Sequence, residues 1–361
     1  MRQNGDGMKI IHTSDIHLAS PLTTRLTPSA ARERKKELTL TFRRIIEDAE
    51  RAGAEALIIA GDLFDNERVS ARAIDEIMGI IEKCHDLTFF YLPGNHEKDR
   101  ILESGVNIPR NLKIFGEDWT YFKLGEVTIV GRREICDDAF SALTLNEDEV
   151  NLVVLHGELS ERTKAPDKIG TKDIEALPID YLALGHYHSY SATNIGKRTT
   201  AVYCGTPEGR GFDEAGDKGY VVVDTNGKFI THRFKKSAAR TMRIIEVDIS
   251  DAERHIELED RVSSALTEAR SEDLVRVVLI GEHAPGVQRD TESLEKRFSP
   301  SFFYFEVKDK SRLKISPDEY KNDKSLKGEF IRLVMSKDGL TDEEKEAVIE
   351  CGIRALAGET V

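Results

Sequence analysis

Side chains that can bind a metal ion recur in five short motifs of this sequence. One motif lies in the stretch LGHYHSY, residues 184–190, where two histidines stand one residue apart. Imidazole nitrogens together with carboxylate and amide oxygens suit Mn, Fe, Zn or Ni, and no thiolate belongs to the set. The motifs are SDIH with Asp15 and His17, GDLFD with Asp62, GNHE with Asn95 and His96, LHGE with His156, and GHYH with His186 and His188. This combination predicts a site for divalent metal ions.

A purely structural role is the alternative for each motif by itself. A lone histidine at the end of a strand is more often hydrogen-bonded to its surroundings than bound to a metal, and GDLFD or GNHE could be an ordinary turn. However, five of the ten histidines fall in these motifs, each after an apolar segment. We therefore favour one shared site over five unrelated structural roles.

Predicted buried strands precede or contain all five motifs. These strands span residues 8–15, 54–65, 87–97, 150–158 and 178–188. Helices are expected at about 28–53, where apolar residues recur with helical spacing before Gly53, and at about 68–84. The alternation of strand and helix is typical of a parallel α/β sheet. Because ligands bind outside the carboxyl ends of parallel strands, the five motifs should meet at one edge.

The rest of the chain supplies further predicted elements. Shorter strands are expected near 112–115, 119–124 and 127–131, and strands near 199–204, 218–224 and 228–234 are expected to complete a second sheet. After residue 240 a new strand–helix pattern begins, which predicts a second small α/β domain. Two amphipathic helices follow, at about 323–336 and 342–356, with these apolar positions: Phe330, Ile331, Val334, Met335, Val348, Ile349, Ile353 and Leu356. Docking on the chain's own core and binding of a partner fit these stripes equally well.

The order of the motifs, D-x-H, G-D, G-N-H-E, a lone His and G-H-x-H, resembles that of the calcineurin-like metallophosphoesterases. The resemblance implies a two-sheet α/β sandwich flanked by helices, with a dinuclear metal site at its edge. Together with the later elements it implies three parts. They are a metallophosphoesterase domain at 8–235, a small α/β capping domain at 241–312 and a C-terminal helical tail at 313–361 that could contact an ATPase partner.

The resemblance also implies a role for each matching residue. The ligands implied are Asp15, His17 and His188 for one ion, Asn95, His156 and His186 for the other, and Asp62 as the bridge. His96 would bind no metal and would stabilise or protonate the leaving group. Two divalent ions are implied, with Mn²⁺ as the expected species. Two cations about 3.5–4 Å apart can hold the attacking and leaving oxygens of an in-line displacement.

Two positions depart from the pattern of this family. Glu97 stands where aspartate is commoner, and it can still accept a hydrogen bond from His96. Asp65 stands where some members have a histidine proposed to position a DNA end. The polarity and efficiency of DNA cleavage are therefore left open.

The SDIH and GDLFD regions and the segment YCGTPEGRGFDEAGDKGYVVVD at 203–224 resemble SbcD-type DNA repair nucleases. The small second domain stands where those nucleases carry a DNA-contacting capping domain, and the tail resembles the YhaO-like branch of that group. This resemblance implies a 3′→5′ DNA exonuclease with some single-strand endonuclease activity, acting with an SMC-like (SbcC-type) ATPase and able to form a homodimer. A small-molecule or cyclic-nucleotide phosphodiesterase and a non-catalytic DNA-repair scaffold are the alternatives.

Basic residues cluster in two parts of a chain whose net charge is −13. Residues 25–44 hold seven basic and two acidic residues, and residues 197–243 hold ten and five. Such clusters beside a metal site can follow a phosphate backbone without reading sequence. For the first cluster, the alternative is that its basic residues form the solvated face of a helix. The candidate DNA contacts are Arg132, Arg133, Lys197, Arg198 and Arg210.

Composition favours a cytoplasmic protein with no membrane segment. No apolar run approaches the roughly 20 residues that span a bilayer. The first seven residues are polar and resemble no signal peptide. The four cysteines are scattered without a CxxC pair, which is typical of a reducing compartment.

The spacing of His186 and His188 suggests how one motif could serve two ions. In an extended segment, residues i and i+2 lie on the same side, roughly 6.5 Å apart. The two imidazoles could therefore reach neighbouring cations, whereas Tyr187 should point away into packing.

Overall fold

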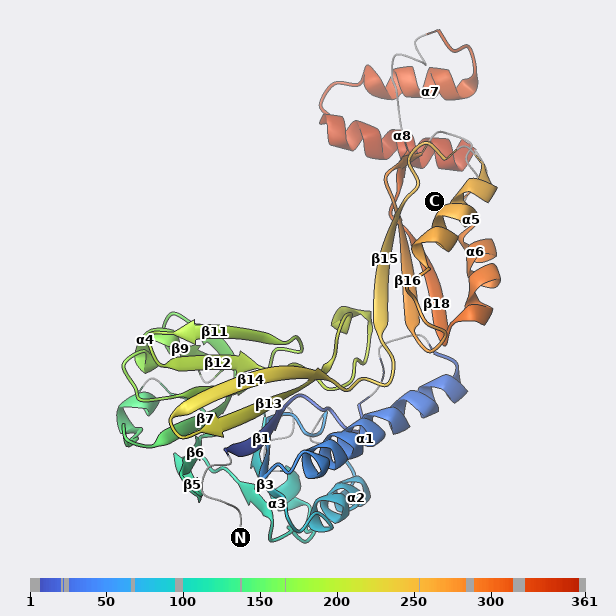
Figure 1. Cartoon of the computed structure of the whole chain (residues 1–361). Helices are drawn as coiled ribbons and strands as arrows, with labels where there is room; N and C mark the ends of the chain where they lie inside the picture. Colours follow the sequence, from blue (N-terminus) through green and yellow to red (C-terminus); the bar gives the residue numbers. More distant parts are fainter. Residues whose placement is uncertain are drawn as a thin grey trace. The chain divides into compact units, whose positions relative to one another are not determined.

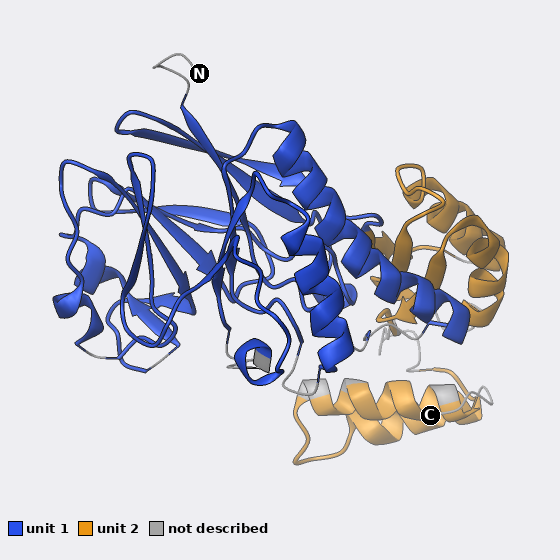
Figure 2. Ribbon diagram, turned by 90° about the horizontal axis from the view of Figure 1, so that it is seen from below, with its two compact units in different colours: residues 1–241 blue, residues 242–361 orange. Residues whose placement is uncertain are grey.

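The computed structural model describes residues 7–20, 22, 26–65, 69–94, 100–136, 138–165, 167–252, 254–283, 289–313 and 322–356. The chain divides into two compact units, Met1–Thr241 and Met242–Val361 (Figure 2). The predicted boundary between a capping domain and a tail, at residue 312, stays a prediction.

The first unit contains two six-stranded sheets (Figure 1). The first sheet has the order β14-β13-β1-β2-β3-β4 and the second has the order β11-β12-β10-β7-β6-β5. The strands of the first are β1 (Met8–Thr13), β2 (Ala56–Ala60), β3 (Thr88–Leu92), β4 (Leu112–Ile114), β13 (Gly219–Asn226) and β14 (Phe229–Lys236). Those of the second are β5 (Thr120–Leu124), β6 (Val127–Gly131), β7 (Val150–His156), β10 (Tyr181–Gly185), β11 (Ser191–Ile195) and β12 (Thr199–Tyr203). The predicted α/β fold with two sheets is confirmed.

Parallel pairing brings the strand ends that precede the motifs together. In the first sheet, β1 pairs in parallel with β2, and β2 with β3. In the second, β7 pairs in parallel with β10, in a register that sets Gly185 beside His156. The polar residues that end or follow these strands therefore emerge at one edge of each sheet.

Helix α1 (Pro28–Arg51) covers the outer face of the first sheet. It begins where the Thr27 hydroxyl accepts a hydrogen bond from the backbone N–H of Ala30, with proline at the first helical position. It ends before Gly53, whose φ of 66° breaks the helix. One face of α1, including Phe42, is buried against β1 and β2. The remaining elements of this unit are α2 (Ala71–Glu82), α3 (Arg100–Glu103), α4 (Thr171–Ile174), β8 (Glu158–Ser160), β9 (Lys168–Gly170), η1 (Ala139–Ala142) and η2 (Phe212–Glu214).

A separate apolar core lies between the two sheets. Ile58 of β2 and Val221 of β13 meet Leu152 of β7 and Ala183 of β10 there, all fully buried. Burying an isoleucine, valine or leucine side chain contributes about 1.5–3 kcal/mol, so this core holds the two sheets face to face. The sandwich is what allows ligands from both sheets to share one edge.

The predicted placement of two strands is wrong. β13 and β14 join the first sheet, where β13 pairs antiparallel with β1 (Ile10 opposite Val223), and they do not complete the second. Both sheets bury strands on two faces, so the apolar run YVVV at 220–223 fits either sheet equally well. Only long-range pairing decides between them.

The second unit contains a parallel three-stranded sheet. Its strands are β15 (Met242–Asp248), β16 (Leu274–Ile280) and β18 (Tyr304–Asp309). Helix α5 (His255–Ala265) contacts β15 and helix α6 (Thr291–Phe298) contacts β18, around a core that includes Val262, Val277 and Leu294. Shorter pieces are β17 (Glu282–His283), β19 (Arg312–Leu313) and η3 (Ser299–Ser301). These strands and helices alternate as the sequence pattern after residue 240 indicated, and the extent of a separate capping domain stays a prediction.

Two helices, α7 (Leu326–Met335) and α8 (Asp342–Leu356), end the described chain. They bury part of their apolar stripes against each other, through Ile331, Val334, Ile349 and Ile353. Other members of the stripes, such as Val348, are exposed. Within the described residues, no helix combines the length and the apolar character that crossing a membrane requires.

Candidate metal centre

Strained backbone marks the ends of the motif strands. Asp15 and His17 after β1 have φ of 49°, Asp62 after β2 has 50°, and His186 after β10 has 101°. These are four of the six described non-glycine residues with positive φ, a conformation that costs about 1–3 kcal/mol each. The bond from the Asp15 N–H to the Gly61 carbonyl, at 3.0 Å, helps to hold it. Such strain clusters at functional sites.

Asp15, His17 and His188 form the first potential metal-binding group. One ligand atom from each lies within 4.8 Å of the others. The Nε2 atoms of the two histidines are 3.3 Å apart, and Nε2 of His188 is 3.7 Å from Oδ1 of Asp15. Asp15 and His17 are almost fully buried, which leaves His188 as the partly exposed member.

His188 is held from two directions by a segment whose role the sequence did not indicate. Its Nδ1 lies 2.7 Å from Oε1 of Glu214, and Lys218 donates to its backbone carbonyl at 2.6 Å. Burial raises the pKa of Glu214, but the bonds from His188 and Arg210 outweigh it and lower the pKa to about 2. An ionised carboxylate only accepts, so Nδ1 carries the hydrogen and Nε2 is left as a ligand atom. The only signal was FDEAGDKG, which contains both residues.

The geometry of the two facing imidazoles fits a bound cation. Nδ1 of His17 lies 3.4 Å from Oδ1 of Asp65, as Nδ1 of His188 lies near Glu214. With both hydrogens on Nδ1, two nitrogen lone pairs face each other at 3.3 Å beside the Asp15 carboxylate. Lone pairs in this arrangement repel, whereas a divalent ion placed among them would satisfy both.

Asp15, Asp62 and His156 form the second group, so Asp15 belongs to both. Nδ1 of His156 is 3.0 Å from the Ala60 carbonyl and Nε2 is 3.4 Å from Oδ2 of Asp62. Burial lowers the pKa of His156, but the carboxylates of Asp62 and Asp15 outweigh it and raise the pKa to about 9. Concentrated negative charge of this kind attracts a proton or a cation.

His186 lies beside the second group, but neither group of potential ligand atoms includes a His186 nitrogen. Its ring centroid is 5.5 Å from that of His156, and its backbone N–H donates to both oxygens of Asp15 at 3.1 Å. His188 belongs to the first group and the His186 ring lies near His156 of the second, and their assignment to different ions stays a prediction. The reason given for this was wrong, because β10 ends at Gly185 and the φ of His186 is not that of an extended segment.

Several predicted residues lie outside the described chain or have other surroundings. Asn95, His96 and Glu97 lie outside the described residues, so their roles stay predictions. Tyr187 does not point into the core: it is 43% exposed, with its ring edge-to-face with Tyr203 at 4.9 Å.

Asp65 lies next to the first group, in contact with a predicted DNA-binding residue. Its Oδ1 is 2.7 Å from Nη1 of Arg210, which also bonds Glu214. Burial raises the pKa of Asp65, but contacts with His17 and Ser20 and the charge of Arg210 lower it well below its usual range.

The other candidate DNA contacts are mostly engaged with acidic or carbonyl groups. Arg198 makes two bonds to Asp180, at 2.7 and 2.8 Å, and Arg133 bonds Glu117 at 2.7 Å. Arg132 donates to the carbonyl of Glu134 at 2.9 Å. Lys197 is exposed in the turn between β11 and β12. Binding of DNA by these residues stays a prediction.

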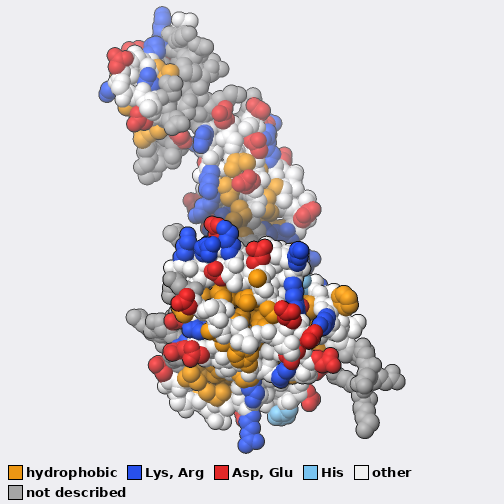
Figure 3. Space-filling view, turned by 90° about the vertical axis from the view of Figure 1, so that its left-hand side faces the viewer, with side chains coloured by type: hydrophobic (Ala, Val, Ile, Leu, Met, Phe, Trp, Pro, Cys, Tyr) orange, Lys and Arg blue, Asp and Glu red, His pale blue; other side chains and the backbone are white. Residues whose placement is uncertain are grey.

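One basic residue of the first cluster is not part of a basic surface. Arg34 is 1% exposed and donates to Glu208 at 3.0 Å and to the Gly209 carbonyl at 2.6 Å. More generally, Lys and Arg side chains lie beside Asp and Glu side chains on the face of the first unit in Figure 3. The count of charges along 25–44 therefore overstated the basic surface.

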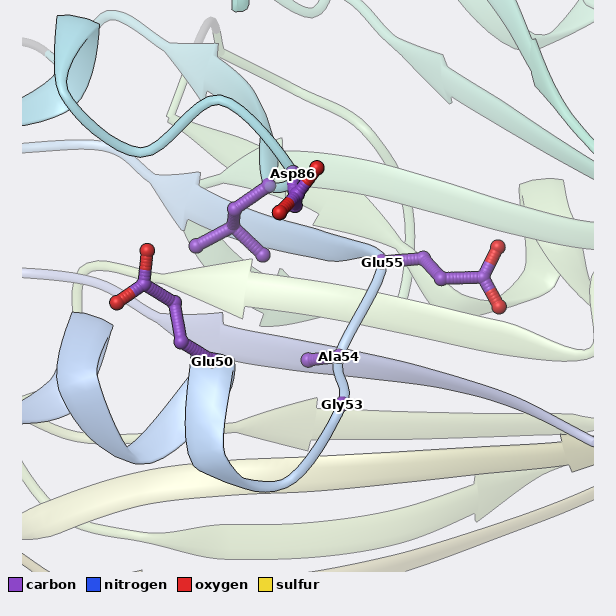
Figure 4. Close-up of a pocket in the computed structure, with 6 residues that line it drawn as sticks. Glu50, Gly53, Ala54, Glu55 and Asp86 are labelled. Carbon is purple, nitrogen blue, oxygen red and sulfur yellow. The ribbon is translucent and has the colours of Figure 1, made fainter.

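A cavity at the amino ends of β2 and β3 has no part in this site. It is lined by Glu50, Gly53, Ala54, Glu55, Asp86 and Leu87 (Figure 4). These residues precede the two strands, whereas Asp62 follows β2 at its carboxyl end. The cavity and the metal-binding groups are therefore at opposite edges of the first sheet.

Two curated relatives and one family model agree with the resemblance. The chain is 26% identical over 294 residues to an uncharacterized metallophosphoesterase, YhaO, of Bacillus subtilis, across 76% of this chain and 72% of that protein. It is 24% identical over 363 residues to the DNA double-strand break repair protein Mre11 of Methanosarcina acetivorans, across 93% of this chain and only 57% of that protein. A solved purple acid phosphatase of yellow lupin aligns with a TM-score of 0.45 at 12% identity, over 65% of this chain and 52% of that one. The family model for calcineurin-like phosphoesterases matches residues 8–207, more than half of the chain, and the protein therefore belongs to that family.

Proposed function

We propose that this protein is a two-metal phosphodiesterase that cleaves DNA. The observation that supports it most is the pair of donor groups that share Asp15, one with His17 and His188 and one with Asp62 and His156. A site built for a single ion does not need two overlapping sets of donors at the ends of strands from two sheets.

The ligands divide between two positions. Asp15, His17 and His188 would hold one ion and His156, His186 and Asn95 the other, and the Asp62 carboxylate, close to both His17 and His156, would bridge them. Imidazole, carboxylate and amide ligands without thiolate fit Mn²⁺, which is the ion we propose.

The chain's own residues would share the work of phosphodiester hydrolysis. Two divalent ions, when bound, supply Lewis acidity and lower the pKa of bound water. His96 would stabilise or protonate the leaving oxygen, since a histidine titrates in the range that general acid catalysis needs. Glu97 would accept a hydrogen bond from His96 and orient its ring.

DNA is the proposed substrate, with 3′→5′ exonuclease and some single-strand endonuclease activity. The motifs of SbcD-type nucleases and the name of the archaeal relative, a double-strand break repair protein, support this choice. An SMC-like, SbcC-type ATPase is the proposed partner, and a homodimer the proposed assembly. The chain spans little more than half of that relative, so these remain proposals about this shorter sequence.

One assay tests the proposal against its rivals. The purified full chain is incubated with Mn²⁺, Mg²⁺ or EDTA on 3′- and 5′-end-labelled duplex DNA, on single-stranded DNA and on a chromogenic phosphodiester, with Asp62→Ala as the inactive control. We expect Mn²⁺-dependent shortening from the 3′ end, lost in EDTA and in the control. Cleavage of the small ester alone would favour a small-molecule or cyclic-nucleotide phosphodiesterase. No cleavage despite two bound ions would favour a scaffold.

A further inference from the structure

Arg210 lies between two carboxylates that belong to different parts of the chain. Its Nη1 donates to Oδ1 of Asp65 at 2.7 Å, and its Nη2 and Nε donate to Oε1 of Glu214 at 2.7 and 3.0 Å. Asp65 follows β2 of the first sheet, whereas Glu214 belongs to η2, after the second sheet. One guanidinium therefore joins two segments that are far apart in the sequence.

Each of these carboxylates faces the Nδ1 atom of a histidine in the first donor group. Asp65 lies 3.4 Å from Nδ1 of His17, and Glu214 lies 2.7 Å from Nδ1 of His188. The Nε2 atoms of the same rings face each other at 3.3 Å. The order of contacts is thus His17, Asp65, Arg210, Glu214, His188, and it closes at the point where a metal ion would bind.

We infer that Arg210 is a positioning residue, which sets both histidines of one metal position through Asp65 and Glu214. The inference rests on the proposed metal centre and adds to it a specific role for a residue that contacts neither substrate nor metal. Carboxylates that orient metal-binding histidines fix the tautomer and the ring. Arg210 holds the two carboxylates in place through its bonds to both.

The surroundings of Arg210 favour this role over that of a DNA contact. Its side chain is 15% exposed, and the fork of its guanidinium is already used on two carboxylates. Its backbone N–H also donates to Oε2 of Glu214 at 2.8 Å, and the carbonyl of the preceding Gly209 accepts from buried Arg34 at 2.6 Å. A planar, five-donor group suits this position, whereas lysine offers one point charge.

Titration of the metal-free full chain with MnCl₂ tests the inference. Binding is followed by calorimetry and metal analysis, and electron paramagnetic resonance distinguishes a spin-coupled pair of ions from a single one. For Arg210→Gln we expect one Mn²⁺ to bind about 10–100-fold more weakly, the other as in the wild type, and the coupled signal to be replaced by that of an isolated ion. Arg210→Lys should weaken the same ion less.

Arg198→Gln is the matched control, because Arg198 also makes two bonds to one carboxylate, Asp180, but outside the site. It should bind both ions as the wild type does, and circular dichroism checks that every variant is folded. If Arg210→Gln does not fold, Arg210→Lys carries the test. The inference would be overturned if a folded Arg210 variant bound both Mn²⁺ ions with wild-type affinities. It would also be overturned if the affinities for both ions fell equally. A wild type that binds no pair of ions would overturn the proposed centre as well.

Discussion

The carbonyl oxygen of Ala60, at the end of β2, is 3.0 Å from Nδ1 of His156, at the end of β7. This hydrogen bond joins the carboxyl edges of the two sheets. Because the carbonyl only accepts, it places the hydrogen on Nδ1 and leaves Nε2 of His156 facing Asp62. Gly185 allows the approach: a Cβ atom there would lie 1.8 Å from the same oxygen.

Gly185→Ala should therefore separate the sheets at the metal site. We expect loss of Mn²⁺ binding together with a destabilisation of about 1–3 kcal/mol, since backbone at 1.8 Å has no room for a methyl group. Gly79→Ala is the control. Gly79 lies inside α2 with open space around it, and alanine there should stabilise the protein by about 0.5–1 kcal/mol. Metal analysis and urea unfolding measure both effects, and a Gly185→Ala protein with full metal content would contradict the account.

The sequence predicts the parts of the fold that depend on local pattern. Apolar runs that end in polar residues locate β1, β2, β7 and β10, and helical spacing locates α1 to within a few residues. The donors Asp15, Asp62 and His156 meet because each follows or ends a parallel strand. These features need no knowledge of long-range contacts.

The remaining features depend on contacts that are distant in sequence. Glu214 lies 26 residues beyond His188, and the fold of the intervening segment, which includes β11 and β12, brings them together. Arg34 has basic neighbours in sequence, yet burial beside Glu208 gives it a structural role. The left-handed backbone of Asp15 follows from tertiary contacts at the strand ends, which override the usual preference of a non-glycine residue.

Arg34→Met should destabilise the first unit strongly. Glu208, 1% exposed, accepts from Arg34 at 3.0 Å, from Thr41 at 2.9 Å and from the backbone N–H of Ala239 at 2.7 Å. Removing the arginine leaves a buried carboxylate without its charge partner. This should lower the free energy of unfolding, measured with denaturant, by about 3–5 kcal/mol.

A second arginine of α1 provides the control for Arg34. Arg43 pairs with Glu76 on the surface, where both side chains are about half exposed, so Arg43→Met should change stability by no more than about 1 kcal/mol. Adding Glu208→Gln to Arg34→Met should recover part of the loss, because the buried Glu208 no longer carries a charge without its partner. If Arg34→Met and Arg43→Met lost equal amounts of unfolding free energy, the buried pair of Arg34 and Glu208 would have no special role in stability.

Asp62→Ala and His96→Gln should separate metal binding from turnover. Asp62 lies within 4 Å of both His17 and His156, so its loss should remove bound Mn²⁺ and all cleavage. His96→Gln should keep both ions and lower the rate by about 10²–10⁴-fold, the usual contribution of a general acid. Metal analysis and single-turnover cleavage make the comparison. An empty site in His96→Gln would show that His96 is a ligand.

His12 should make the first unit sensitive to mild acid. It is fully buried between the sheets, with Nδ1 3.0 Å from the Tyr181 hydroxyl, and burial with the nearby charge of His232 lowers its pKa to about 3. The unfolded chain, with a histidine pKa near 6.5, then binds the proton more readily than the folded one. The stabilisation is present above pH 6.5 and is lost as the pH falls toward 3.

From pH 7 to pH 5 the wild type should lose about 2 kcal/mol more unfolding free energy than His12→Gln. His85→Gln, at an exposed position, should behave as the wild type. Equal losses in His12→Gln and the wild type would mean that His12 does not stay neutral in the folded protein.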